Sequence, residues 1–191
     1  MYLFLSILIV IFIGILILVS NSIIKENEKY YSIDKYKQKV LLKLIEKEID
    51  EMDGFKFEEF CCKLFNMNNF KAKTTPKTGD GGRDIIIKDY KGTIYVECKH
   101  YNIHNKIGTN LIHKLISSCV VDNIERGIFI TTSTYTKESV KLVEKCKVVK
   151  IDLWYKEDLL ELCKNINMYD MLMWLGYSKN YIDYYLNNAI I

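Results

Sequence analysis

The chain has 191 residues and a formal net charge of +3, from 27 Lys and Arg against 24 Asp and Glu. So mild a basicity excludes a protein that binds nucleic acid through overall charge alone, although local basic patches remain available. The six cysteines include no C-x-x-C motif and no disulfide-framework spacing, which excludes a disulfide scaffold and argues against structural zinc.

An uncharged apolar segment, YLFLSILIVIFIGILILV, occupies residues 2–19. In a helix it would span roughly 27 Å, just enough to cross a bilayer core. No Lys or Arg precedes it and VSNSII is a poor cleavage site, so we expect an uncleaved anchor at 1–20 rather than a signal peptide. Lysines exceed acids between residues 25 and 43, and the positive-inside rule therefore predicts a single-pass membrane protein with its carboxyl-terminal part in the cytoplasm.

Residues 21–50 are predicted to form a polar juxtamembrane tether and then an amphipathic helix. From Ile33 to Met52, apolar residues recur at helical spacing. The apolar face could pack on the domain that follows or pair with another chain below the membrane. The first reading is favoured, because two or so heptads are too few for a coiled coil.

Residues 51–165 have the length of one domain. Periodicity and turn signals predict an α/β sandwich in which an antiparallel hairpin, closed by the turn DYKG, feeds a partly parallel sheet. A helical extension at 166–191 is expected to cover it. The expected elements are a helix at 55–68, strands at 70–75, 84–88 and 93–99, a helix at 107–121, a strand at 126–133, a helix at 136–146, a strand at 147–152 and a helix at 155–164.

Three charged residues are expected to meet on this hairpin. Side chains alternate along a strand, so Glu97 and Lys99 point the same way while Cys98 points away. Pairing of the two strands would bring in Asp84, which follows a glycine-rich turn. Such an acid and lysine usually form a weak solvated pair, but this strand is otherwise apolar, and Glu58 on the preceding helix offers a further acid.

This set of groups suits phosphodiester cleavage. The carboxylates of Asp84 and Glu97 and the backbone carbonyl of Cys98 are hard oxygen ligands of the kind that Mg²⁺ prefers. The metal would polarise the scissile phosphate and lower the pKa of a bound water. Lys99 would then offset the negative charge that develops on the phosphorane.

Five segments in this order resemble the Mrr-type restriction endonuclease domain of the PD-(D/E)XK nuclease superfamily: FEEF, TPKTGDGGRDI, YVECKHY, IGTNLIHKL and RGIFITTSTYTKES. The resemblance covers roughly Met52 to Leu162. It implies a restriction-endonuclease-like three-layer sandwich with a mixed central sheet. It also implies that Asp84 and Glu97 bind metal, that Lys99 is the catalytic lysine, and that Glu58 supports the metal or its waters.

Two residues depart from the family pattern. Arg83 stands where the superfamily name leads one to expect proline, and His113 stands where this family commonly has glutamine. Glu97, where many Mrr-like domains carry glutamine, restores the general superfamily pattern and favours an intact metal site.

The resulting hypothesis is a membrane-anchored, type IV restriction-like DNA endonuclease that uses Mg²⁺, with Mn²⁺ as a substitute, on double-stranded DNA. Cleavage of both strands implies a homodimer. Because the region before the domain is too short for a recognition module, either a separate partner supplies specificity or the enzyme is weakly specific. The alternatives are a structure-selective nuclease of the Holliday-junction type, a non-cleaving nucleic-acid-binding module and a membrane scaffold. Candidate DNA contacts are Lys77, Arg83, His100, Tyr101 and His113, with Lys106 and Lys114 as further phosphate contacts.

Overall fold

A mixed five-stranded sheet with strand order β1-β2-β3-β4-β5 forms the centre of the computed structural model, which describes residues 2–76 and 81–188, with side chains from Leu16 onward. β1, β2 and β3 pair antiparallel, and β3, β4 and β5 pair parallel. This confirms the predicted α/β fold with a hairpin feeding a partly parallel sheet. The strands are β1 (Lys71–Thr74), β2 (Ile85–Asp89), β3 (Gly92–Lys99), β4 (Arg126–Thr131) and β5 (Lys150–Trp154).

The β2–β3 hairpin fixes the register on which the site depends. Asp89 caps the turn by accepting a hydrogen bond from the backbone N–H of Lys91 at 2.7 Å, and Gly92 adopts a φ of +129°, which favours glycine. Ile85 lies opposite Val96. Asp84, one residue before β2, donates its backbone N–H to the carbonyl of Val96 at 2.7 Å. The start of β2 therefore lies beside the carboxyl end of β3.

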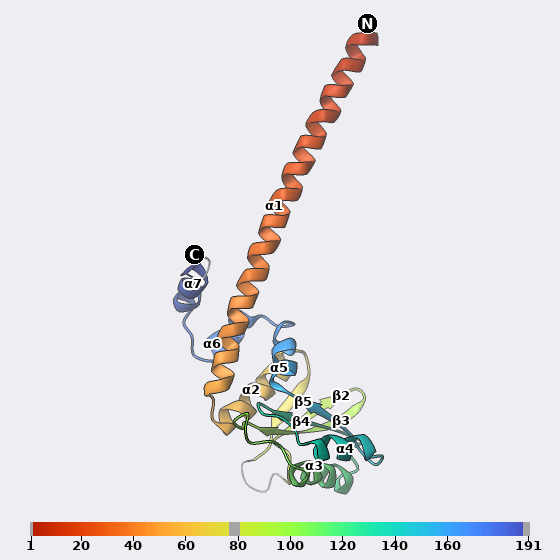
Figure 1. Cartoon of the computed structure of the whole chain (residues 1–191), viewed down its shortest axis with the longest axis vertical. Coiled ribbons are helices and arrows are strands. Elements are labelled where there is room, and N and C mark those ends of the chain that lie inside the picture. Colours follow the sequence, from red (N-terminus) through yellow and green to blue (C-terminus); the bar gives the residue numbers. More distant parts are fainter. Residues whose placement is uncertain (1, 77–80, 189–191) are drawn as a thin grey trace.

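Helices cover both faces of the sheet, giving three layers (Figure 1). On β3, Ile94, Val96 and Cys98 face the layer that contains α2, α5, α6 and α7, while Tyr95 faces α3 and α4. By the two-residue alternation, Glu97 also lies on the α3 face. The helices are α2 (Gly54–Met67), α3 (Thr109–Val121), α4 (Lys137–Lys145), α5 (Lys156–Cys163), α6 (Met168–Trp174) and α7 (Lys179–Asn188).

Helix α1 (Tyr2–Glu51) is continuous and stands out from the domain as a long rod (Figure 1). No Gly or Pro interrupts the sequence from residue 15 to residue 53, so the segment predicted as a tether is part of the same helix. Its last turns bury Val40, Leu44, Ile45 and Ile49 against the domain, which confirms that this apolar face packs on the domain.

Within the described residues, no helix is both long and apolar enough to cross a membrane. Most of the span predicted at 2–19 lies outside the described side chains, which begin at Leu16.

Among the carboxyl-terminal elements, β5 differs from expectation in its start and in its burial. β5 begins at Lys150 rather than at 147, and it is partly exposed instead of fully buried. The reason is its place at the edge of the sheet, where β4 is its one partner among the described strands. The tail forms two helices, α6 and α7, and buries Met171, Leu172 and Ile182 in the core, as predicted for covering helices.

Candidate active site

Asp84, Glu97 and Lys99 meet at the carboxyl end of β3. The carboxylate of Asp84 accepts a hydrogen bond from the backbone N–H of Cys98 at 2.7 Å, which ties the start of β2 to the end of β3. The ammonium of Lys99 lies 2.6 Å from Oε1 of Glu97 and 3.4 Å from Oδ2 of Asp84. The predicted meeting of the two acids and the lysine is thus present in the structure.

The backbone carbonyl of Cys98 joins the same group. It accepts a hydrogen bond from Nζ of Lys99 at 2.9 Å. Three oxygens, from Asp84, Glu97 and Cys98, therefore surround a single point, which the ammonium nitrogen fills. They are the same three oxygens that the sequence predicted as metal ligands.

The site is shielded from water, which strengthens its electrostatics. Asp84 is 6% exposed and Glu97 is 5% exposed. Burial alone lowers the pKa of Lys99, but the charge of Glu97, its hydrogen bond and the charge of Asp84 outweigh burial, and the pKa of Lys99 lies above its ordinary value. Lys99 is therefore charged at neutral pH.

The residues present fit a hard divalent cation. The three converging atoms are carboxylate and carbonyl oxygens, the hard ligands that such a cation prefers. Mg²⁺ requires only one or two protein carboxylates, because it keeps several waters. Among the described residues, no three His, Cys, Asp or Glu side chains form a metal-sized group. Glu58 on α2 therefore does not complete a three-side-chain centre with Asp84 and Glu97, and its supporting role remains a prediction.

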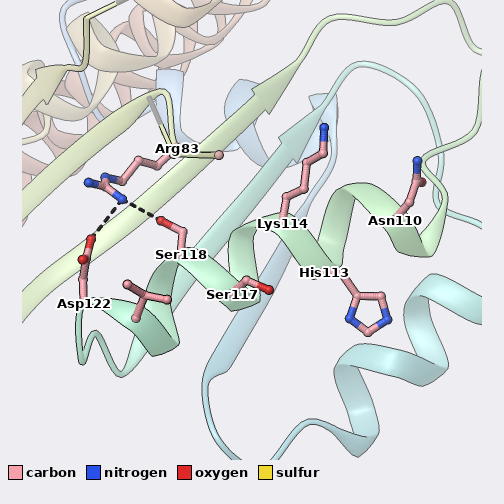
Figure 2. Close-up of a pocket in the computed structure, with 10 residues that line it drawn as sticks. Arg83, Asn110, His113, Lys114, Ser117, Ser118 and Asp122 are labelled. Atoms are coloured by element: carbon pink, nitrogen blue, oxygen red, sulfur yellow. Dashed lines mark hydrogen bonds and ion pairs between the residues drawn. The ribbon is translucent and has the colours of Figure 1, made fainter. Parts of the chain in front are cut away.

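Beside this centre, an open hollow of about 630 Å³ lies between the Gly81–Arg83 turn and the outer side of α3 (Figure 2). Arg83 anchors the turn to that helix. Its Nη1 lies 2.7 Å from Oγ of Ser118 and 3.0 Å from Oδ2 of Asp122. The guanidinium also lies 4.4 Å from the ring centre of Tyr95, whose hydroxyl donates to Oδ2 of Asp122 at 2.7 Å.

The candidate DNA contacts fall into different environments. Arg83 is held by the contacts just described, and the His100 ring bonds the carbonyl of Ile49 at 2.7 Å, so both side chains have structural partners. Tyr101 is 37% exposed just beyond the end of β3. His113 is exposed on α3 and lines the hollow. Lys77 lies outside the described residues.

The sequence did not reveal the group formed by Arg83, Tyr95, Ser118 and Asp122. Ser118 and Asp122 are four residues apart, so they share one helix face and mark it as polar. Their partner Arg83 lies 35 residues before Ser118, and no spacing rule links a turn to a helix at that separation. Only the strand pairing and the position of α3 over Tyr95 bring these residues together.

Comparison with known proteins identifies the domain. The family model of the restriction endonuclease domain Mrr_cat matches residues 49–163, more than half of the chain. The chain belongs to the Mrr-type restriction endonuclease family. It accordingly carries a restriction-endonuclease-like nuclease domain, and Asp84, Glu97 and Lys99 all lie inside the matched region.

Three proteins are similar to this chain in sequence or in fold. The chain is 25% identical over 131 residues to the uncharacterized protein y4cE of Sinorhizobium fredii (strain NBRC 101917 / NGR234), which covers 65% of this chain and 34% of that protein. The DNA modification-dependent restriction endonuclease AspBHI has a similar fold, with a TM-score of 0.52, 20% identity and coverage of 81% of this chain and 40% of that chain. A structure of the MspJI restriction endonuclease in complex with a 27-mer oligonucleotide matches with a TM-score of 0.46 and 14% identity, over 78% of this chain and 34% of that chain. The matched part of this chain thus spans at most 40% of each of these three proteins.

Proposed function

We propose that this chain is a metal-dependent DNA endonuclease that hydrolyses phosphodiester bonds and acts in the restriction of foreign DNA. The observation that carries the proposal is the convergence of the oxygens of Asp84, Glu97 and Cys98 on the ammonium of Lys99. Membership of a restriction endonuclease family supports the interpretation of this group of atoms as a nuclease centre.

The chemistry assigns a task to each side chain. Asp84, Glu97 and the Cys98 carbonyl would hold Mg²⁺, or Mn²⁺ in its place, and the bound ion supplies Lewis acidity and an activated water. Lys99 keeps a fixed positive charge beside the position of the scissile phosphate. Negative charge grows on the phosphate as the reaction proceeds, so a preorganised cation stabilises the transition state more than the ground state.

The proposal also covers location and assembly. We infer that residues 2–19 anchor the chain in a membrane with the nuclease domain in the cytoplasm, because this segment is uncharged and lysines follow it. Each chain has one candidate centre, so cutting both strands calls for a homodimer on the DNA. The specificity of a type IV restriction-like enzyme would then reside in a partner protein.

Plasmid cleavage by the full-length chain, solubilised in detergent, tests the proposal. With Mg²⁺ we expect nicking and linearisation of supercoiled plasmid, and a rate lower by roughly a hundredfold or more for Asp84→Ala and for Lys99→Ala. Glu144→Ala, at an exposed acid of α4, is the matched control and should cleave like wild type. Equal rates for wild type and the two site variants would refute the proposal.

The same assay separates the alternatives. Preference for a four-way junction over plain duplex would favour a structure-selective nuclease. Binding of duplex without any cleavage would favour a nucleic-acid-binding module. Comparison of methylated with unmethylated plasmid measures whether the enzyme depends on modification.

A further inference from the structure

The hollow beside α3 is a separate place from the catalytic centre. Its walls are the Gly81–Arg83 turn on one side and the outer face of α3 on the other (Figure 2). Asp84, Glu97 and Lys99 are not among the residues that line it. Its volume of about 630 Å³ is ample for a sugar–phosphate unit.

The charges around the hollow favour an anion. Arg83 and Asp122 form an ion pair at 3.0 Å, so their charges largely cancel. Lys114 is exposed on the wall, and no ion pair involving it is found in the described part of the chain. Of the described residues that line the hollow, Asp122 is the one acid. The charges of these described lining residues therefore sum to one positive charge, and the amide of Asn110 and the hydroxyl of Ser117 add hydrogen-bond donors.

The turn is built to lie close against the helix. Gly81 and Gly82 adopt φ values of +63° and +83°, a conformation that favours glycine. A Cβ on Gly82 would lie 3.3 Å from Cβ of Lys114 and 3.4 Å from its carbonyl oxygen, tighter than ordinary packing. Because Arg83 is also bonded to Ser118, the wall is fixed before any ligand arrives.

The hollow lies close to the carboxylates of the candidate active site. Gly82 is two residues before Asp84, so at most about 7 Å of extended chain separates them. α3 covers the same face of the sheet on which Glu97 lies. Duplex DNA carries a phosphate about every 3.4 Å of axis on each strand. A duplex with one phosphate at the carboxylates therefore has neighbouring phosphates spaced closely enough to reach the adjoining turn at Gly82.

From these observations we propose that the α3 hollow binds a backbone phosphate of the DNA near the scissile one. Lys114 is the charged contact, and Asn110 and Ser117 donate hydrogen bonds. The inference rests on the proposed nuclease function and adds a site that positions the duplex without reading its sequence.

Duplex binding by the full-length chain tests this site, with Ca²⁺ in place of Mg²⁺ so that affinity is measured separately from cleavage. Lys114→Gln removes one positive charge from the hollow, and Lys141→Gln removes one from an exposed position on α4 that lies outside the hollow. Both variants lose the same net charge. We expect Lys114→Gln to weaken binding about three- to tenfold and to reduce the slope of log affinity against log salt by about 0.9. Lys141→Gln should match wild type on both measures.

Cleavage with Mg²⁺ completes the test. Lys114→Gln should lower kcat/KM by about the same three- to tenfold factor as its affinity, and Lys141→Gln should keep the wild-type kcat/KM. If wild type cleaves DNA but the two lysine variants have equal affinities and salt slopes, the hollow proposal is overturned and the nuclease proposal stands. If wild type neither binds nor cleaves duplex, both proposals fall.

Discussion

Replacing Lys99 by Met should destabilise the metal-free protein while leaving its shape nearly intact. Met has a similar length but no charge. In wild type the ammonium lies 2.6 Å from Glu97 and 3.4 Å from Asp84. The two carboxylate side chains are only 7% and 6% exposed, and the lysine side chain is 22% exposed. The variant would therefore keep two buried acids without their shared cation.

The magnitude follows from this burial. Breaking a buried ion pair by removing one partner costs about 3–5 kcal/mol. The lower end, about 3 kcal/mol, applies because Lys99 keeps some contact with solvent. In a chain of this length each kcal/mol lowers the melting temperature by about 2–4 °C, so the expected loss is roughly 6–12 °C.

Thermal unfolding with and without Ca²⁺ measures this effect. In wild type the ammonium of Lys99 fills the point where the three oxygens converge. In Lys99→Met that point is free for a cation, so Ca²⁺ should stabilise the variant more than wild type and recover much of the lost melting temperature. Lys141→Met on α4 is the control for the substitution itself and should melt like wild type. A variant as stable as wild type without Ca²⁺, or equal Ca²⁺ shifts in both, would show that Lys99 does not occupy the cation position.

Two further predictions concern the α3 side of the sheet and the buried thiols. Burial raises the pKa of Cys119 to about 11 and that of Cys163 to about 12. Both thiols should resist iodoacetamide at pH 8 in the folded chain and react after urea unfolding; equal labelling in both states, read by peptide mass mapping, would contradict this. Because the two thiol pKa values are higher in the folded chain than in the unfolded chain, the unfolded chain loses its thiol protons first as pH rises. The stability that the two thiols contribute is therefore complete below about pH 9 and is lost as pH rises toward 12. Asp122→Asn weakens the contacts of Arg83 and Tyr95 and should cost roughly 1 kcal/mol after discounting for solvent screening, seen as a lower urea midpoint; an unchanged midpoint would refute the anchoring role of this group.

Local patterns were enough to predict most of the fold. Alternation along 93–99 and the turn DYKG gave the hairpin, and the register of that hairpin gave the meeting of Asp84 with Glu97. Register is a local property here, because the short turn leaves the strands little freedom. The partial exposure of β5 was not predictable, because an apolar run does not reveal whether a strand is central or at an edge.

The hollow beside α3 shows why the rest of the site escaped prediction. The sequence indicates Lys114 only as one of several plausible phosphate contacts, since an isolated helical lysine is usually solvated. What distinguishes it is the turn at Gly82, which lies against it in space although 32 positions separate the two residues in sequence. Such a contact depends on how a helix crosses the sheet, which side-chain periodicity does not specify.

The unbroken α1 has a consequence for how the nuclease would search. From Leu16 to the first buried residue, Val40, the helix stands largely exposed for 24 positions, a rigid length of about 36 Å. A flexible linker of the same length would have a mean reach of about 27 Å in every direction. If its amino-terminal end is held in a membrane, the rigid helix keeps the catalytic centre at a fixed distance from the membrane surface, whereas a flexible linker would let that distance vary. DNA would then be cleaved only at that distance, and a Gly-Gly hinge in the helix would widen the range of distances at which cleavage occurs.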